Sequence, residues 1–151
     1  MSDEVHVFDR LLEIALLIQQ DMAHAFAGTA LTAARVHLLW ELQRLGPSTQ
    51  QALATALDVS PRNVTGLVDA LEPAGYVERR PHPTDRRATL VTLTGSGAET
   101  MAQMARERQQ VATELVADLG PEALAAFRGA LDTVAGRLHA MVEAAATPDP
   151  A

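Results

Sequence analysis

Residues 60–94 read SPRNVTGLVDALEPAGYVERRPHPTDRRATLVTLT, and this stretch decides the fold. Its opening Ser-Pro pair is an N-cap with proline at the first helical position, so we predict a helix from there to about residue 73 or 74. Residues 76–80 and 88–93 are short and rich in β-branched or aromatic side chains, which predicts strands. Residues 81–87 contain two prolines and an aspartate, which favour a turn. The stretch therefore predicts a helix followed by a β-hairpin.

The residues before this stretch predict a partner for that helix. The tetrapeptide STQQ from Ser48 matches an S-x-x-Q capping box whose serine is the N-cap, and Asp58-Val59 predicts a tight turn at the end of the new helix. A further helix is expected between a Thr32 cap and Gly46-Pro47. Two short helices joined by a few residues are typical of a helix-turn-helix. With the hairpin directly after it, this pattern predicts a winged helix with a two-stranded β wing.

Long helices are predicted at both ends of the chain. Apolar residues recur every three or four positions over 8–22 and over 124–141, with another helix expected between them. More than one face of the terminal helices is apolar, so we prefer a homodimer interface to a three-helix core within one chain. The predicted protein is mainly α. It has an N-terminal dimerisation helix in 1–30, a winged helix-turn-helix in 31–95, C-terminal dimerisation helices in 96–146 and a disordered tail in 147–151. The N-terminal and C-terminal helices are expected to form a dimerisation bundle.

Composition argues against several classes of chemistry. The 151 residues contain no cysteine, which excludes disulfides, cysteine-ligated metals and thiol redox sensing. No two of the five histidines are spaced to share a metal on a helix, no motif names a catalytic site, and no apolar run approaches the length of a membrane span. We therefore expect a cytoplasmic protein that is not an enzyme and uses no metal or cofactor.

The charge distribution favours one local site for nucleic acid. The net charge is −7, yet all twelve basic residues are arginines, and four of them lie within residues 79–87 beside a single acid, Asp85. Arginine favours bidentate or groove-inserted contacts, and the acidic remainder repels DNA elsewhere. We expect DNA to bind only where this basic site meets it.

Residues 31–97 resemble the DNA-binding core of the MarR family of bacterial transcriptional regulators. The resemblance is carried by Asp85-Arg86-Arg87 followed by Leu93-Thr94, which is the wing signature, and by the L-V-D-x-L-E-x-x-G of residues 67–75. It implies an obligate homodimer on a pseudo-palindromic operator, usually repression, and often release by a small aromatic or anionic ligand. It also implies that Arg87 enters the minor groove. Family members usually carry glycine where Asp58 stands, so this turn departs from the family pattern.

The helix after Ser60 has an inner apolar face and an outer polar face, which we interpret as the DNA face. Arg62 can bond guanine, Asn63 can pair with adenine, and Thr65 can touch a thymine methyl or a phosphate. The residues expected to contact double-stranded DNA are Ser60, Arg62, Asn63, Thr65, Gly66, Arg79, Arg86 and Arg87. Asp69 is expected to orient an arginine or to accept from a cytosine amine. Asp85 is expected to brace the wing by pairing with an arginine, or to be an ordinary turn aspartate.

A small-molecule pocket is also predicted, near the junction of the dimer and DNA-binding regions. Its expected lining is Met22, Phe26, Arg35, His37 and Trp40, although core packing explains the apolar members equally well. The alternatives to a repressor are an activator or dual regulator and, from another class, a winged-helix module that binds proteins. An interaction module would carry apolar residues at the wing tip, where this chain has arginines.

Overall fold

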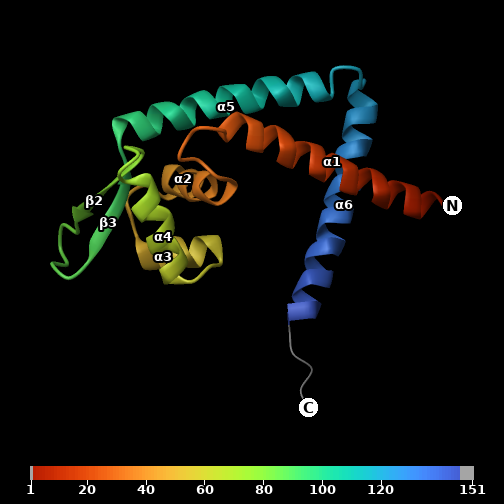
Figure 1. Cartoon of the computed structure of the whole chain (residues 1–151). Helices are drawn as coiled ribbons and strands as arrows, with labels where there is room; N and C mark the ends of the chain where they lie inside the picture. Colours follow the sequence, from red (N-terminus) through yellow and green to blue (C-terminus); the bar gives the residue numbers. More distant parts are fainter. Residues whose placement is uncertain (1, 147–151) are drawn as a thin grey trace, which may run out of the picture. The chain divides into compact units, whose positions relative to one another are not determined.

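The computed structural model describes residues 2–146, so the predicted tail at 147–151 lies outside the described residues. The elements in chain order are α1 (Asp3–Phe26), α2 (Ala33–Leu45), β1 (Ser48–Thr49), α3 (Gln50–Leu57), α4 (Pro61–Leu71), β2 (Val77–Pro81), β3 (Thr89–Leu93), α5 (Gly95–Leu115) and α6 (Pro121–Ala146) (Figure 1). The chain forms two compact units that divide after Met104. The prediction of a mainly α chain with a winged helix-turn-helix is confirmed.

Side-chain caps fix the starts of α2 and α4. Ser60 Oγ accepts from the Asn63 amide at 3.2 Å, with Pro61 at the first helical position, as predicted. Thr32 Oγ1 likewise accepts from the Arg35 amide at 3.3 Å at the start of α2. These local bonds explain why α2 and α4 begin where the sequence indicates.

The predicted start of α3 is wrong by one residue. Thr49, not Ser48, is the N-cap, and its Oγ1 accepts from the Ala52 amide at 3.2 Å. Ser48 instead lies in β1, opposite Val91 of β3, and its hydroxyl donates to the Gly46 carbonyl at 2.9 Å. The wing sheet therefore has three strands in the order β1-β3-β2, all antiparallel, where two were expected.

Helix α4 also ends earlier than predicted, at Leu71. Pro73 has no amide to continue the helical ladder, and Gly75 reverses the chain with φ of +82°. On the other side of α4, Asp58 closes α3 in the left-handed conformation, with φ 52° and ψ 47°. It is the only non-glycine residue with positive φ in the described part of the chain.

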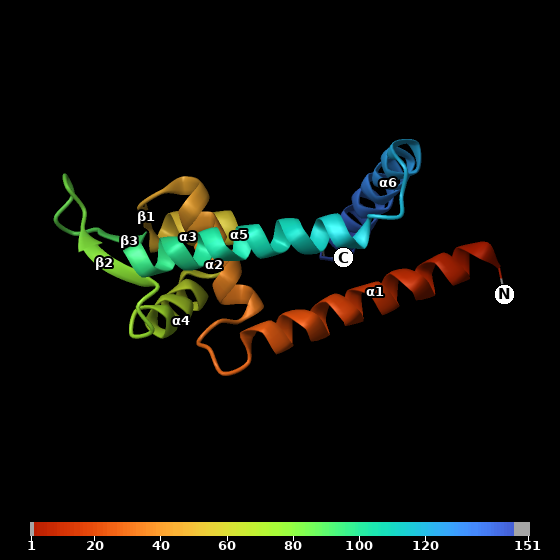
Figure 2. The same ribbon diagram turned by 90° about the horizontal axis from the view of Figure 1, so that it is seen from above.

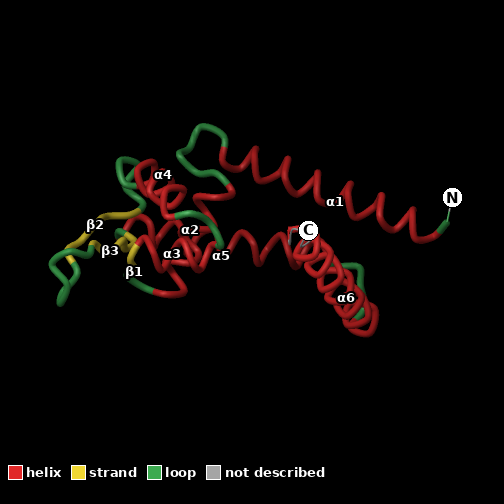
Figure 3. Tube along the Cα trace, turned by 90° about the horizontal axis from the view of Figure 1, so that it is seen from below, coloured by secondary structure: helices red, strands yellow, loops and turns green. Residues whose placement is uncertain are grey.

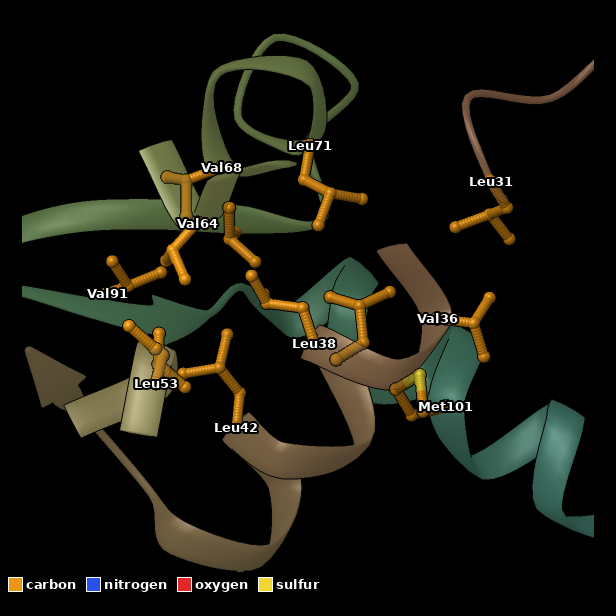
Figure 4. Close-up of a cluster of buried hydrophobic side chains, with 13 residues drawn as sticks. Leu31, Val36, Leu38, Leu42, Leu53, Val64, Val68, Leu71, Val91 and Met101 are labelled. Atoms are coloured by element: carbon orange, nitrogen blue, oxygen red, sulfur yellow. The ribbon is translucent and has the colours of Figure 1, made fainter. Parts of the chain in front are cut away.

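The core of the first unit gathers buried side chains from α2, α3, α4, β2, β3 and α5, and from Leu31 before α2 (Figure 4). Val64, Val68 and Leu71 of α4 are fully buried, which confirms the predicted inner face of that helix. The other buried apolar residues are Leu31, Val36, Leu38, Leu39, Leu42, Leu53, Ala54, Val77, Val91 and Met101. This packing fixes α4 against α2 and α3 and leaves its opposite face exposed.

The long helices α1 and α6 are drawn as unbroken helices in Figure 3, yet they bury almost nothing within the chain. No residue of α1 is buried, and Phe8 is 59% exposed. In the second unit, Phe127 and Leu138 of α6 are 45% and 58% exposed. None of the helices between residues 2 and 146 is both long and apolar enough to span a bilayer.

Candidate nucleic-acid interface

The outer face of α4 presents polar groups that the fold does not use. Arg62, Asn63 and Gly66 are exposed beside the capping residue Ser60. Within residues 2–146, no hydrogen bond or ion pair engages the Arg62 guanidinium. Its five donors are therefore free to meet an acceptor outside the chain.

Thr65 differs from its neighbours because its hydroxyl already has partners. Oγ1 donates to the Pro61 carbonyl at 3.0 Å and lies 3.2 Å from Gln50 Oε1 of α3. The side chain is half-buried between the two helices. The single proton of this hydroxyl is taken inside the fold, by the Pro61 carbonyl or by Gln50 of α3, and is not available as a free donor.

The wing tip is held by two side-chain acceptors. Asp85 Oδ1 accepts from the Arg87 amide at 2.9 Å, which is a backbone bond in place of the expected pairing with an arginine side chain. His82 Nδ1 accepts from the amides of Thr84 and Asp85 at 3.3 and 3.1 Å. The sequence reasoning missed His82, although an acceptor side chain two or three residues before unpaired amides is a known turn signal.

Beyond this turn, Arg86 and Arg87 are exposed at the end of the hairpin, which projects away from α3 and α4 (Figure 2). In the described part of the chain no carboxylate pairs with either guanidinium. The acid nearest in sequence, Asp85, is turned to the backbone amide of Arg87. The positive charge of the wing tip is therefore uncompensated.

Arg79 is placed differently, between the end of α4 and the strand β2. Its Nη2 donates to Asp69 Oδ1 at 2.6 Å, its Nη1 donates to Glu72 Oε2, and its amide donates to Glu72 Oε1 at 3.0 Å. The hydrogen bond to Asp69, reinforced by Glu72, raises the pKa of the Arg79 guanidinium above its usual value. Arg79 thus remains charged and is bound to two carboxylates. Asp69 orients an arginine, which is one of the two roles expected for it.

Only part of the predicted ligand pocket comes together. Met22 and Phe26 line a cavity of about 300 Å³ in the first unit, together with Leu31 and Thr32. The other predicted members do not line it. Arg35 Nη1 donates to the Ala30 carbonyl at 2.6 Å, His37 is exposed, and Trp40 packs against the core. Among the described residues, no group of histidines and carboxylates is arranged to hold a metal ion.

Comparison with known proteins places this geometry in a family. The MarR family model matches residues 31–89, from the end of the α1–α2 loop to the first residue of β3 in the wing. The HTH-type transcriptional regulator ML2140 of Mycobacterium leprae is 34% identical over 96 residues, which are 64% of this chain and 67% of that protein. The HTH-type transcriptional repressor YetL of Bacillus subtilis is 32% identical over 107 residues, covering 68% of this chain and 62% of YetL. The match thus spans about two thirds of the length of these curated relatives.

The fold is shared over nearly the whole chain with a solved structure. FabT of Streptococcus pneumoniae, crystallised in complex with DNA, superposes with a TM-score of 0.81 at 18% identity, covering 92% of this chain and 99% of FabT. Together with the relatives above, the winged helix and its basic wing show that this chain belongs to the MarR family of transcriptional regulators.

Proposed function

We propose that the protein binds a specific operator through α4 and the wing and represses transcription from it. The observation that carries the proposal is the set of three uncompensated guanidinium groups, on Arg62, Arg86 and Arg87, at the exposed start of α4 and the exposed wing tip. In an acidic chain, three such groups on α4 and the wing favour a polyanion at this surface. Repression is favoured by the similarity to YetL, which is a transcriptional repressor. We propose the cytoplasm as the place of action, because the protein would reach the genome there.

In this proposal α4 lies in the major groove. Arg62 and Asn63 read base edges, and Ser60 lies near a phosphate at the helix N-terminus. The Thr65 methyl meets a thymine, because the hydroxyl is used inside the fold. Gly66 lets the helix backbone approach the groove closely. Arg87 enters the minor groove while Arg86 bonds the backbone, so the wing adds affinity and a preference for narrow grooves.

The binding unit in this proposal is a homodimer formed by the terminal helices. Apolar side chains along α1 and α6 are exposed in the single chain, and patches of this extent mark interaction surfaces. A cavity of about 500 Å³ lined by Val116, Leu124, Phe127 and Leu131 opens on α6, where a second copy could insert side chains. A two-fold dimer presents two equivalent α4 helices, so its site contains inverted half-sites about one helical turn apart.

A small effector is proposed at the cavity of about 300 Å³ beside Met22 and Phe26. Its lining suits a small aromatic molecule, with Thr32 as a polar contact. Such a ligand relieves repression only if it prefers the conformer that cannot bind DNA. Binding assays with phenolic acids, in the absence and presence of operator DNA, would measure that preference.

Selection of duplexes from a random pool by the purified protein tests the function. We expect enrichment of inverted half-sites, and light scattering of the unbound protein should give twice the mass of one chain. Enrichment of single asymmetric sites, or of no sequence at all, would refute the proposed operator. Transcription in vitro from a promoter that overlaps the selected site should then fall as protein is added. A rise would identify an activator.

A further inference from the structure

We propose that Arg79 is a positioning residue that fastens the recognition helix to the wing, so that both meet DNA as one rigid unit. This inference rests on the proposed DNA binding and gives Arg79 a role other than the direct contact that the sequence suggested. Two carboxylates at the end of α4, Asp69 and Glu72, provide the attachment.

The first support is the way Glu72 holds both the backbone and the side chain of Arg79. Strand β2 is an edge strand of the sheet, so outward amides have no neighbouring strand to bond. The outward Arg79 amide donates to Glu72 Oε1, and the guanidinium donates to the second oxygen of the same carboxylate. One carboxylate at the end of α4 therefore holds both the edge-strand amide and the side chain of Arg79.

The second support is the position of Asp69. It lies three residues before Glu72, so both carboxylates project from the same side of the helix end. The Arg79 side chain is 28% exposed, less than Asp69 at 59% and Glu72 at 37%. Arg79 is thus the inner member of the cluster. A planar guanidinium can bridge two carboxylates, whereas a lysine ammonium offers only a point charge.

A rigid connection matters because specific binding requires two simultaneous insertions. Once α4 is in the major groove, the effective concentration of the wing at the minor groove depends on how firmly it is held relative to α4. If the wing is no longer fastened to α4, its effective concentration at the minor groove of a cognate site falls. Non-specific binding, which has no fixed register, depends on it less.

Electrostatics alone predicts the opposite sign for loss of Glu72. Removing an acid near the DNA face should strengthen binding to a polyanion. We therefore use Glu72→Ala as the main variant. Glu78→Ala is its matched control. Glu78 lies on β2 beside Arg79, and in the interactions described it pairs only with Arg80. Arg79→Lys keeps the charge and removes the bidentate geometry.

Fluorescence anisotropy on the selected operator and on a scrambled duplex, at several salt concentrations, measures the effect. We expect Glu72→Ala and Arg79→Lys to weaken operator binding about tenfold, with an unchanged slope of log K against log salt and little change on scrambled DNA. Glu78→Ala should bind as tightly as the parent protein or more tightly. Circular dichroism confirms that each variant is folded.

Amide hydrogen exchange of the free protein gives a readout that needs no DNA. The Arg79 amide should be protected in the parent protein and in Glu78→Ala, and should lose protection in Glu72→Ala. Tighter operator binding by Glu72→Ala, or unchanged affinity of Arg79→Lys, would overturn the positioning role. If the parent protein selects no DNA, the proposed function fails instead, and hydrogen exchange still tests whether Glu72 holds the strand.

Discussion

Replacement of Gly66 by alanine should make the protein more stable and its operator binding weaker. Gly66 lies inside α4, is exposed, and has no positive φ, and an added Cβ meets no atom within 4 Å. The substitution therefore changes only the helix propensity of the position in the free protein. Glycine inside a helix costs about 0.5 to 1 kcal/mol relative to alanine.

A gain of about 1 kcal/mol corresponds to a roughly fivefold change in the unfolding equilibrium and to a rise of about 2 to 4 °C in the midpoint for a chain of this size. On DNA, the same methyl group would hold the backbone of α4 away from the groove. The expected weakening is about 1 to 3 kcal/mol on the operator, comparable to one base contact. Urea unfolding followed by circular dichroism and anisotropy titration of the operator measure the two effects separately.

This prediction requires two opposite effects of one substitution, higher stability and weaker operator binding. A residue that serves only as part of a solvated helix face would gain stability with no change in affinity. Unchanged or tighter operator binding would therefore refute the close approach of α4 to the groove. A decrease in stability would show instead that the position is not open in the folded protein.

The remaining predictions concern DNA contacts and backbone strain. Arg62→Ala should relax the preference at one position per half-site at a cost of about 1 to 3 kcal/mol, measured by repeating the selection; an unchanged consensus would move base reading elsewhere. Arg87→Ala should weaken operator and scrambled DNA together and flatten the salt slope by about 0.9 for each phosphate that is no longer neutralised, whereas an unaltered slope would mean that this arginine is only solvated. Gly97→Ala should destabilise the fold by about 1 to 3 kcal/mol or more, because its Cβ would clash with the Tyr76 carbonyl oxygen; a thermal midpoint at or above that of the parent protein would contradict the packing. Asp58→Gly should raise the midpoint by relieving up to about 1 kcal/mol of left-handed strain, and a lower midpoint would show that the aspartate side chain stabilises the turn.

The sequence alone predicted those features whose hydrogen-bond or packing partners lie within a few residues along the chain. The Ser60 cap and the buried face of α4 follow from spacing alone, because a helix places those atoms together wherever it sits. The start of α3 was missed because Ser48 is taken by a strand pair with Val91, which is distant in sequence. Nothing local distinguishes the resulting two-residue strand from a capping box.

In the candidate site, too, features set by nearby residues were predicted and features set by tertiary packing were not. The spacing of the wing predicted an exposed basic tip, and the uncompensated Arg86 and Arg87 agree with it. It could not show that Arg79, on the same basic run, faces the end of α4, since that depends on how the hairpin packs on the helix. The pocket prediction grouped Arg35 and His37 with Met22 because all three were expected near the junction of the dimer and DNA-binding regions, yet Arg35 and His37 lie outside the cavity lining.

None of the residues of helix α1 is buried within its own chain. An isolated helix gains most of its stability from packing, so α1 leaves the ribosome without the neighbours that would hold it. In the proposed dimer those neighbours come from a second finished chain. The yield of dimer then depends on whether a chain meets its partner before proteases degrade it. In such a dimer, few encounters would occur at low expression, and unpaired chains would be cleared first. The cell would then set a threshold of synthesis below which the operator stays empty, before any effector is considered.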